Sequence, residues 1–233
     1  MVNERANTNT RQKLGDARCP SAHLVAIQAA NGTGETVVGA LIAARLATAD
    51  PDRLVVAAAM TNGAIAQFSE SVLRLSEYRY LNSLYFITDT ALVDGTPTTP
   101  IDLHSKLNRL AMDYHDQMGL VEYNTCCRYA LGRRLLEEAL FRLELTAQLT
   151  DKEREEYRIA ERENPETTTK AFRIMYCVRR SNIVYITTAS LLNSTASSDC
   201  WVPYSKSCDV IICDEASQIS RTSNSGGDEF MVA

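Results

Sequence analysis

The chain has 233 residues, of which 45% are hydrophobic and 23% charged, and its formal net charge is −5. This composition is typical of a folded soluble protein and excludes a chain that is disordered throughout. The longest apolar runs are far shorter than the roughly 20 residues of a membrane helix, and residues 1–20 are polar, so we expect no membrane partner, no signal peptide and a cytoplasmic or nuclear location.

Strand and helix patterns alternate over the first part of the chain. Residues 23–29 form a short apolar run typical of a buried strand, and residues 36–47 follow as a helix with one apolar face, Val37, Val38, Leu41, Ile42 and Leu46. Residues 54–59 form a second apolar strand, and a turn at 61–63 precedes apolar side chains at helical spacing, Ile65, Phe68, Val72 and Leu75. With a third strand at 83–88, this order predicts a parallel sheet with helices on its faces.

The pattern from residue 100 to residue 178 is helical almost throughout. One apolar stripe, Leu103, Leu107, Leu110 and Tyr114, ends at Gly119, and another comprises Leu131, Leu135, Ala139 and Leu143. Residues 151–163 are dense in mixed charge and meet Asn164-Pro165, which predicts a solvated helix or turn and then a separate helix over 166–180.

Strand patterns return at residues 183–188 and 210–213, and the latter ends at Asp214 and Glu215. We therefore predict an α/β protein in which residues 21–99 and 181–220 form one domain. A helical insertion at 100–180 interrupts this domain, and flexible segments at 1–20 and 221–233 flank it.

Three groups needed for nucleotide hydrolysis follow these strands. The glycine-rich turn at residues 32–36 offers backbone N–H groups to phosphates at a helix N-terminus. The Thr36 hydroxyl and the Asp214 carboxylate suit Mg²⁺, and Glu215 could position an attacking water. Each feature alone also occurs in ordinary turns, but their order after successive strands predicts a nucleotide site.

The same segments resemble motifs of superfamily 1 helicases of the up-frameshift (nonsense-mediated decay) type. IQAANGTGET at 27–36 is similar to the phosphate loop QGPPGTGKT, and AMTNGAI at 59–65 to the second motif APTNxAV. ITT at 186–188 is similar to a short threonine motif, and CDEASQ at 213–218 to the DEAxQ box. The resemblance covers about residues 22–220 and implies a RecA-like P-loop domain.

By that resemblance, the phosphates of ATP would be bound by Gly32, Thr33, Gly34, Glu35 and Thr36, and Mg²⁺ by Thr36 and Asp214. Glu215 would prepare the water and Gln218 would sense the nucleotide state. Asn62 and Thr188 would lie toward a single strand of RNA or DNA. The alternative is that Asn62 is only a turn residue and Thr188 only a strand end.

The chain departs from the family pattern at three points. Glu35 replaces the lysine that pairs with the β- and γ-phosphates, the Gly-Pro-Pro entry becomes Ala29-Ala30-Asn31, and no strand-helix region for a second RecA-like domain follows Ser220. A charge pair about 4 Å apart at an effective dielectric near 20 contributes roughly 4 kcal/mol, so repulsion in place of attraction could change binding by up to about twice that. We therefore expect weakened binding of ATP and Mg²⁺, little hydrolysis, and at most nucleotide or nucleic-acid binding.

Two alternatives stay open at this point. The chain could be a non-catalytic scaffold whose insertion helices bind a protein partner, or a fragment of a longer, active helicase. The net negative charge gives no global attraction to nucleic acid, so binding would need local basic patches, for which the candidates are Arg128, Arg133, Arg134, Arg179 and Arg180. Ordinary solvated helix faces would also explain these arginines.

The seven cysteines are odd in number and irregularly spaced, which favours reduced thiols over a disulfide framework. Cys200, Cys208 and Cys213 suggest zinc, but no pair has the short spacing of a metal knuckle and no histidine follows His115. We expect no zinc.

Overall fold

The computed structural model describes residues 34–93, 95–96, 98–141, 150–196, 204 and 208–215, together with Val25 and Ile27. The flexible segments expected at 1–20 and 221–233 lie outside these residues, as do Gly32, Thr33 and Gln218. Of the buried strand expected at 23–29, only Val25 and Ile27 are described. Neither residue lies in a strand and both are exposed, at 48% and 53%, so the expectation is wrong at these two positions.

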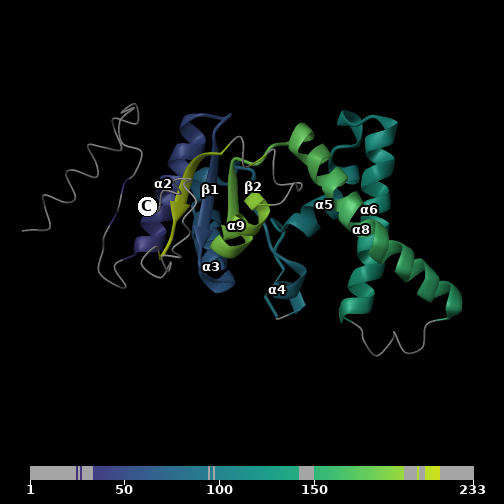
Figure 1. Cartoon of the computed structure of the whole chain (residues 1–233). Coiled ribbons are helices and arrows are strands. Elements are labelled where there is room, and N and C mark those ends of the chain that lie inside the picture. Colours follow the sequence, from purple (N-terminus) through teal and green to yellow (C-terminus); the bar gives the residue numbers. More distant parts are fainter. Residues whose placement is uncertain are drawn as a thin grey trace, which may run out of the picture.

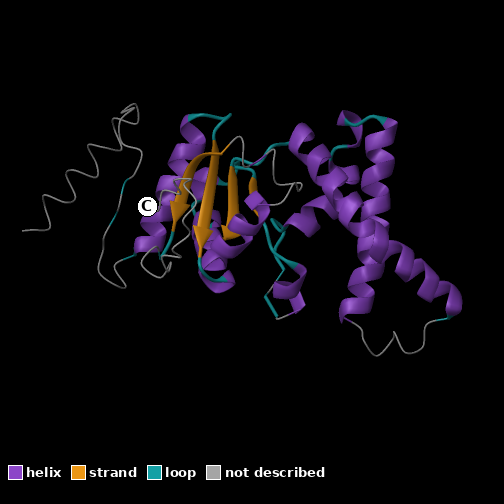
Figure 2. Cartoon of the chain, in the orientation of Figure 1, coloured by secondary structure: helices purple, strands orange, loops and turns teal. Residues whose placement is uncertain are grey.

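A four-stranded parallel sheet forms the centre of the described fold (Figures 1 and 2). Its order is β2-β3-β1-β4, with β1 at Leu54–Ala59, β2 at Ser83–Tyr85, β3 at Ile183–Thr187 and β4 at Cys208–Cys213. All residues of β1 and β3 are buried, which is why both appear in the sequence as continuous apolar runs. The α/β class is confirmed, and so are the strands expected from residues 54, 183 and 210, whereas the strand expected at 83–88 ends at Tyr85.

Two helices, α2 (Glu35–Ala49) and α3 (Asn62–Leu73), cover one face of the sheet. Successive β1 side chains point to opposite faces, so Val55, Ala57 and Ala59 pack in the core beneath these helices. Leu54 and Val56 join the core on the other face, where the helical block lies.

The apolar face expected for α2 is wrong at Val37 and Val38, whereas Leu46 packs partly buried against the core. The buried side chains are Ala40, Ala43, Ala44 and Ala47, whereas Val37 and Val38 are exposed. Small side chains let α2 approach α3 closely, and a Cβ added at Gly39 would lie 3.0 Å from the Phe68 ring. Close packing therefore selects the alanines over the larger apolar residues.

Helix α3 confirms the expected stripe, because Ile65, Phe68 and Val72 are all buried. The helix begins inside the segment expected to be a turn. Thr61 is its N-cap, and the Thr61 hydroxyl oxygen accepts a hydrogen bond from the Ala64 N–H at 3.1 Å. Asn62 is thus the first residue of a helix rather than a turn residue.

The chain between β2 and β3 is mainly helical. It contains α4 (Asp89–Val93), α5 (Leu103–Asp113), the short 3₁₀ helix η2 (His115–Gln117), α6 (Leu120–Phe141) and α8 (Asp151–Val178). Another 3₁₀ helix, η1 (Ser76–Tyr78), lies before β2. Figure 1 shows α5, α6 and α8 standing together beside the sheet. The stripe expected for α5 is confirmed, since Leu103, Leu107 and Leu110 are buried.

The stripe expected for α6 is wrong at Leu131, and its last residue, Leu143, lies outside the described residues. Leu131 is exposed, and the buried face comprises Cys126, Tyr129, Arg133 and Leu136. A buried arginine is compatible with this face because two carboxylates pair with it, as described below.

The break expected at Asn164-Pro165 is also wrong, because α8 continues through Pro165. A capping box between Thr150 and Glu153 starts the helix. Pro165 cannot donate a backbone hydrogen bond, but the Thr167 hydroxyl donates to the Glu163 carbonyl at 3.0 Å and supports the chain around it. Packing against α6 and the sheet thus outweighs the local preference for a break.

Helix α9 (Thr188–Ala196) follows β3 directly. No helix within the described residues combines the length and apolar character needed to cross a membrane.

Candidate functional site

The expected site residues gather at the carboxyl edge of the sheet. In a parallel sheet every strand ends at this edge and the next helix starts there, so helix N-termini and strand-end side chains meet. The described residues of this kind are Gly34, Glu35 and Thr36 at α2, Asn62 at α3, Thr188 at α9, and Asp214 and Glu215 after β4.

The structure brings the two expected Mg²⁺ ligands together. The Thr36 hydroxyl donates a hydrogen bond to Asp214 Oδ2 at 3.3 Å, although the residues are 178 positions apart in the sequence. The Asp214 N–H donates to the Ala58 carbonyl at 2.8 Å, which anchors this carboxylate beside the end of β1. Both side chains are half-buried, so they form a fixed oxygen pair that remains open to solvent.

The N-terminus of α2 has a free electropositive end. Gly34 is the N-cap with φ 89°, a left-handed conformation that glycine adopts without strain, and no side chain of the described residues caps the helix. The first-turn N–H groups therefore remain available to an anion. Glu35 places its own carboxylate in this first turn and is exposed.

Glu215 has the only positive φ among the described residues other than glycine, at 54°. Its N–H donates to Asp214 Oδ1 at 3.2 Å and its side chain is exposed. With this backbone conformation the chain no longer continues in the direction of β4 at Glu215. Glu215 directly follows Asp214, the residue that contacts Thr36.

Asn62 and Thr188 lie at the same edge, each as the first residue of a helix. The Asn62 carbonyl accepts a hydrogen bond from the Tyr85 hydroxyl at 3.2 Å, and Thr188 Oγ1 lies 3.2 Å from Met60 Sδ. These contacts tie both residues to neighbouring strand ends and leave their role toward nucleic acid a prediction.

The oxygen pair fits a magnesium ion better than a softer metal. Mg²⁺ prefers oxygen ligands and keeps several waters, so one hydroxyl and one carboxylate are an adequate protein contribution beside phosphate oxygens. Among the residues that the structure describes, no three His, Cys, Asp or Glu side chains form a metal-binding group. The arrangement therefore suits an ion that arrives with a phosphate ligand.

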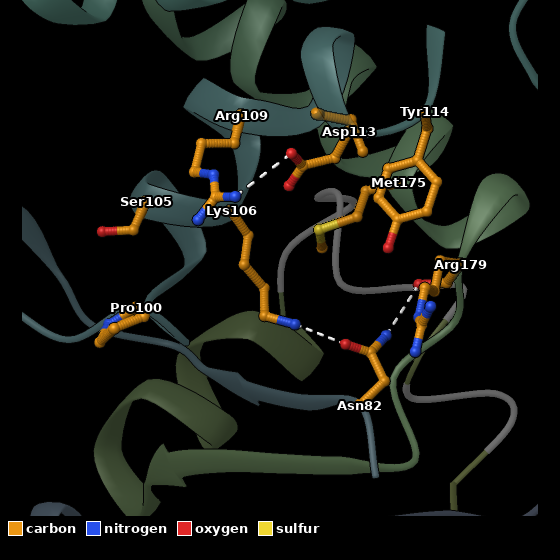
Figure 3. Close-up of a pocket in the computed structure, with 10 residues that line it drawn as sticks. Asn82, Pro100, Ser105, Lys106, Arg109, Asp113, Tyr114, Met175 and Arg179 are labelled. Carbon is orange, nitrogen blue, oxygen red and sulfur yellow. Dashed lines mark hydrogen bonds and ion pairs between the residues drawn. The ribbon is translucent and has the colours of Figure 1, made fainter. Parts of the chain in front are cut away.

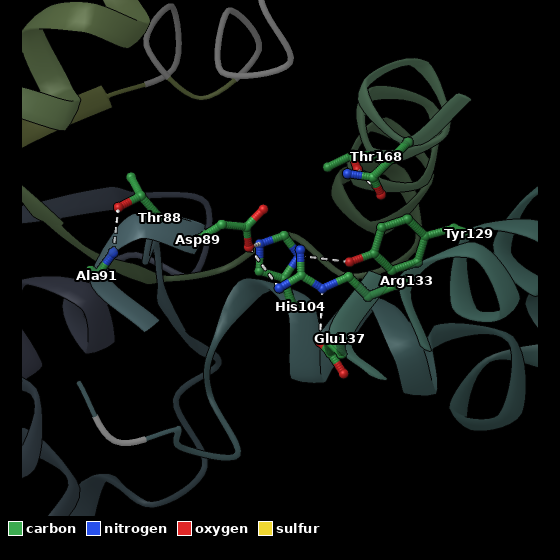
Figure 4. A network of polar contacts seen from close by, with 9 residues as sticks. Thr88, Asp89, Ala91, His104, Tyr129, Arg133, Glu137 and Thr168 are labelled. Atoms are coloured by element: carbon green, nitrogen blue, oxygen red, sulfur yellow. Dashed lines mark hydrogen bonds and ion pairs between the residues drawn. The ribbon is translucent and has the colours of Figure 1, made fainter. Parts of the chain in front are cut away.

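Sequence reasoning missed a polar network that joins α4 to α5 and α6 (Figure 4). Arg133 of α6 pairs with Asp89 at 2.6 Å and with Glu137 at 2.7 Å. His104 of α5 shares a 2.7 Å hydrogen bond with the Tyr129 hydroxyl and lies 3.5 Å from Asp89. The network links α4, which follows β2, to α5 and α6.

The electrostatics of this network follow from its burial. Burial, with a smaller contribution from the nearby Arg133 charge, lowers the pKa of His104 to about 4, and the Asp89 carboxylate offsets only part of this change. Burial acts to raise the pKa of Asp89, but its pairing with Arg133 outweighs this and holds the pKa below its ordinary value. Arg133 is thus an internal ion-pair partner, and its assignment to a basic surface patch is wrong.

One sequence signal could have indicated the network. Arg133 and Glu137 have the spacing of an ion pair along a helix, and Arg133 shares a helical face with Cys126 and Tyr129. Nothing in the local sequence indicates Asp89 or His104, since these residues reach the network only through the tertiary fold.

No model of a known protein family matches the chain, and no curated protein matches it. The interpretation of the carboxyl edge therefore depends on its short motifs and on the contacts described above.

Proposed function

We propose that the chain is a RecA-like P-loop domain of the superfamily 1 helicase type that binds a magnesium nucleotide weakly and hydrolyses ATP at a negligible rate. The observation that carries this proposal is the 3.3 Å contact between Thr36 and Asp214. In a nucleotide site of this class, the hydroxyl that follows the phosphate loop and a strand-end aspartate hold the same ion. Their meeting at the N-terminus of an uncapped helix supports such an ancestry.

Thr36 and Asp214 would hold Mg²⁺, and the first-turn N–H groups of α2 would bind the phosphates. The bound ion would neutralise phosphate charge. Glu215, next to Asp214, would orient water at the edge of the site, and Asn62 and Thr188 would line the side on which a single strand of RNA or DNA could lie.

Glu35 explains why binding is weak. A lysine at this position would attract phosphate, whereas the Glu35 carboxylate repels it from the first turn of the same helix. At about 4 Å and an effective dielectric near 20, each interaction is worth roughly 4 kcal/mol, and the exposure of Glu35 reduces the difference to a few kcal/mol. The remaining difference of a few kcal/mol still corresponds to a loss of about a hundredfold in affinity.

The test is the charge reversal Glu35→Lys, measured by isothermal titration of ATP with and without Mg²⁺. We expect a gain of at least about tenfold in affinity that depends on Mg²⁺ and is lost again when Asp214→Asn is added. Glu77→Lys is the matched control, because it makes the same charge change at an exposed residue of η1. If Glu35→Lys binds ATP no better than Glu77→Lys, the carboxyl edge is not a phosphate site.

A scaffold function is the second candidate, and one observation favours it. Met112, Leu120 and Val121 are exposed apolar side chains at the corner between α5 and α6. Such side chains are common at protein interfaces. This hypothesis predicts that neither the native chain nor Glu35→Lys binds nucleotide, and that charged substitutions at these three positions abolish partner binding.

A further inference from the structure

A basic pocket lies at the amino edge of the sheet, opposite the candidate nucleotide site. It has a volume of about 140 Å³ and lies between α5 and the end of α8. Asn82 stands just before β2 and Arg179 shortly before β3, so both mark the end at which these parallel strands begin. Figure 3 shows Lys106, Arg109 and Arg179 around this pocket.

Asn82 is held rigidly at the base of the pocket. Its backbone N–H donates to Asn182 Oδ1 at 3.0 Å, and its side-chain amide donates to the carbonyls of Arg179 and Arg180 at 3.2 and 3.0 Å. These bonds orient the carboxamide oxygen of Asn82 toward Lys106, whose ammonium group donates to it.

Lys106 is a half-buried cation without a counterion in direct contact. The only hydrogen-bond partner of its ammonium group among the described residues is the neutral amide of Asn82. Burial, with a smaller contribution from the positive charge of Arg179, lowers the pKa of Lys106 to about 8. The Asp113 carboxylate offsets only part of this change. A buried ammonium beside a second cation is costly unless an anion binds to both.

The other charged groups leave this positive charge uncompensated. Among the described residues, Asp113 is the only carboxylate that lines the pocket, and it pairs with Arg109 at 3.3 Å. The Arg179 guanidinium makes no ion pair with any residue in the described part of the chain. Lys106 and Arg179 thus present two charges to one small space, within a chain whose net charge is −5.

We propose that this pocket binds the phosphate group of a small molecule, with Lys106 and Arg179 as its charged ligands and Ser105 and Tyr114 as neighbouring hydroxyl groups. The pocket is smaller than the roughly 300 Å³ at which sites for larger ligands begin, so it fits a tetrahedral oxyanion rather than a whole nucleotide. Arginine and lysine are the usual protein ligands of phosphate. The site is independent of the nucleotide proposed at the carboxyl edge.

The test uses sulfate as the first probe, since its charge stays constant between pH 7 and 9. Sulfate is titrated into the full chain at fixed ionic strength, and binding is followed by amide chemical shifts and by thermal stability. We expect saturable binding that weakens about tenfold or more in Lys106→Met and in Arg179→Gln. Lys152→Met, a matched change at an exposed lysine of α8, should bind sulfate as the native chain does.

The pH dependence separates a role in binding from a merely structural role. Lys106 lines the pocket together with Arg179, the C-cap residue of α8, and with Arg109 and Asp113 of α5. Native affinity for sulfate should fall as the pH rises through about 8, where Lys106 loses its proton. Lys106→Arg should retain binding and lose this pH dependence, because arginine stays charged throughout the range.

Inorganic phosphate and methyl phosphate then distinguish a free anion from a phosphate ester, and saturable binding of either supports the proposal. Equal sulfate binding by the native chain and Lys106→Met would overturn it. So would binding of a single-stranded oligonucleotide that depends on Lys106 without saturable binding of either small phosphate.

Discussion

The stability of the contact between α4 and α6 should depend on the charge of one buried side chain, Arg133. Its side chain is 1% exposed and pairs with Asp89 and Glu137 at 2.6 and 2.7 Å. The two carboxylates are 44% and 34% exposed, so water can solvate them if the guanidinium is removed. The reverse does not hold, because a guanidinium left inside without carboxylates would be an uncompensated buried charge.

Removing the guanidinium and removing the two carboxylate charges should therefore lower the free energy of unfolding by different amounts. Arg133→Met replaces the stem with an apolar chain and leaves two partly hydrated carboxylates, so we expect a loss of about 2 kcal/mol in the free energy of unfolding. The double variant Asp89→Asn/Glu137→Gln keeps the shape and the acceptor oxygens but leaves the buried guanidinium without a counterion. We expect it to lose about 3–5 kcal/mol in the free energy of unfolding. Arg134→Met, at the adjacent exposed arginine, should change stability by no more than about 0.5 kcal/mol.

Urea unfolding followed by circular dichroism measures all three free energies, and unchanged m-values would show that the same two states are compared. The reasoning fails if Arg133→Met costs no more than Arg134→Met, or if the double variant is as stable as Arg133→Met. Either result would mean that Arg133 is solvated, as a surface patch for nucleic acid would require.

Two further changes test the helical block. The pKa of His104 is about 4 in the folded chain and about 6.5 in the unfolded chain, so the unfolded chain binds a proton at His104 at a higher pH than the folded chain does. Stability should therefore fall as the pH drops from about 6.5 toward 4, by up to about 1.4 kcal/mol per pH unit. Urea titrations over that range should show a smaller slope for His104→Asn, and an unchanged slope for His115→Asn, at an exposed histidine, is the control. Pro165→Ala restores a donor within a continuous α8 and should stabilise the chain by about 1–3 kcal/mol; a loss of stability would support a break at Asn164-Pro165.

The sheet could be predicted because its physical cause is local. A parallel strand covered on both faces must be apolar along its whole length, and residues 54–59 meet that requirement in a run that no amphipathic helix would show. The meeting of Thr36 with Asp214 followed from the same logic, since parallel strands deliver their ends to one edge.

The faces of the helices could not be predicted in the same way. Hydrophobic periodicity ranks Val37 above Ala40, but a close helix contact needs a small side chain, and this need depends on the distance to Phe68 in a neighbouring helix. In α6, the side chain at the centre of the buried face is Arg133, whose burial requires Asp89 from a distant element. In α8, tertiary packing retains a helix across Pro165 that local preference would end.

Residue 35 is the point at which helix stability and ligand binding oppose each other. A carboxylate in the first turn of α2 interacts favourably with the positive end of the helix, by about 0.3–1 kcal/mol, and within the described part of the chain no side chain caps that end in its place. Glu35 therefore stabilises the helix, and in the proposed nucleotide site the same carboxylate would repel phosphate from these N–H groups.

Glu35→Lys should then have two effects of opposite sign. Without nucleotide it should lower the free energy of unfolding by roughly 0.5–2 kcal/mol, because an unfavourable charge replaces a favourable one at the helix end. With Mg²⁺ and ATP in excess it should be more stable than the native chain, by an amount that grows with ligand concentration. Thermal unfolding with and without the ligand measures both effects in one protein, and a variant stabilised under neither condition, despite a folded spectrum, would show that charge at residue 35 does not control the site.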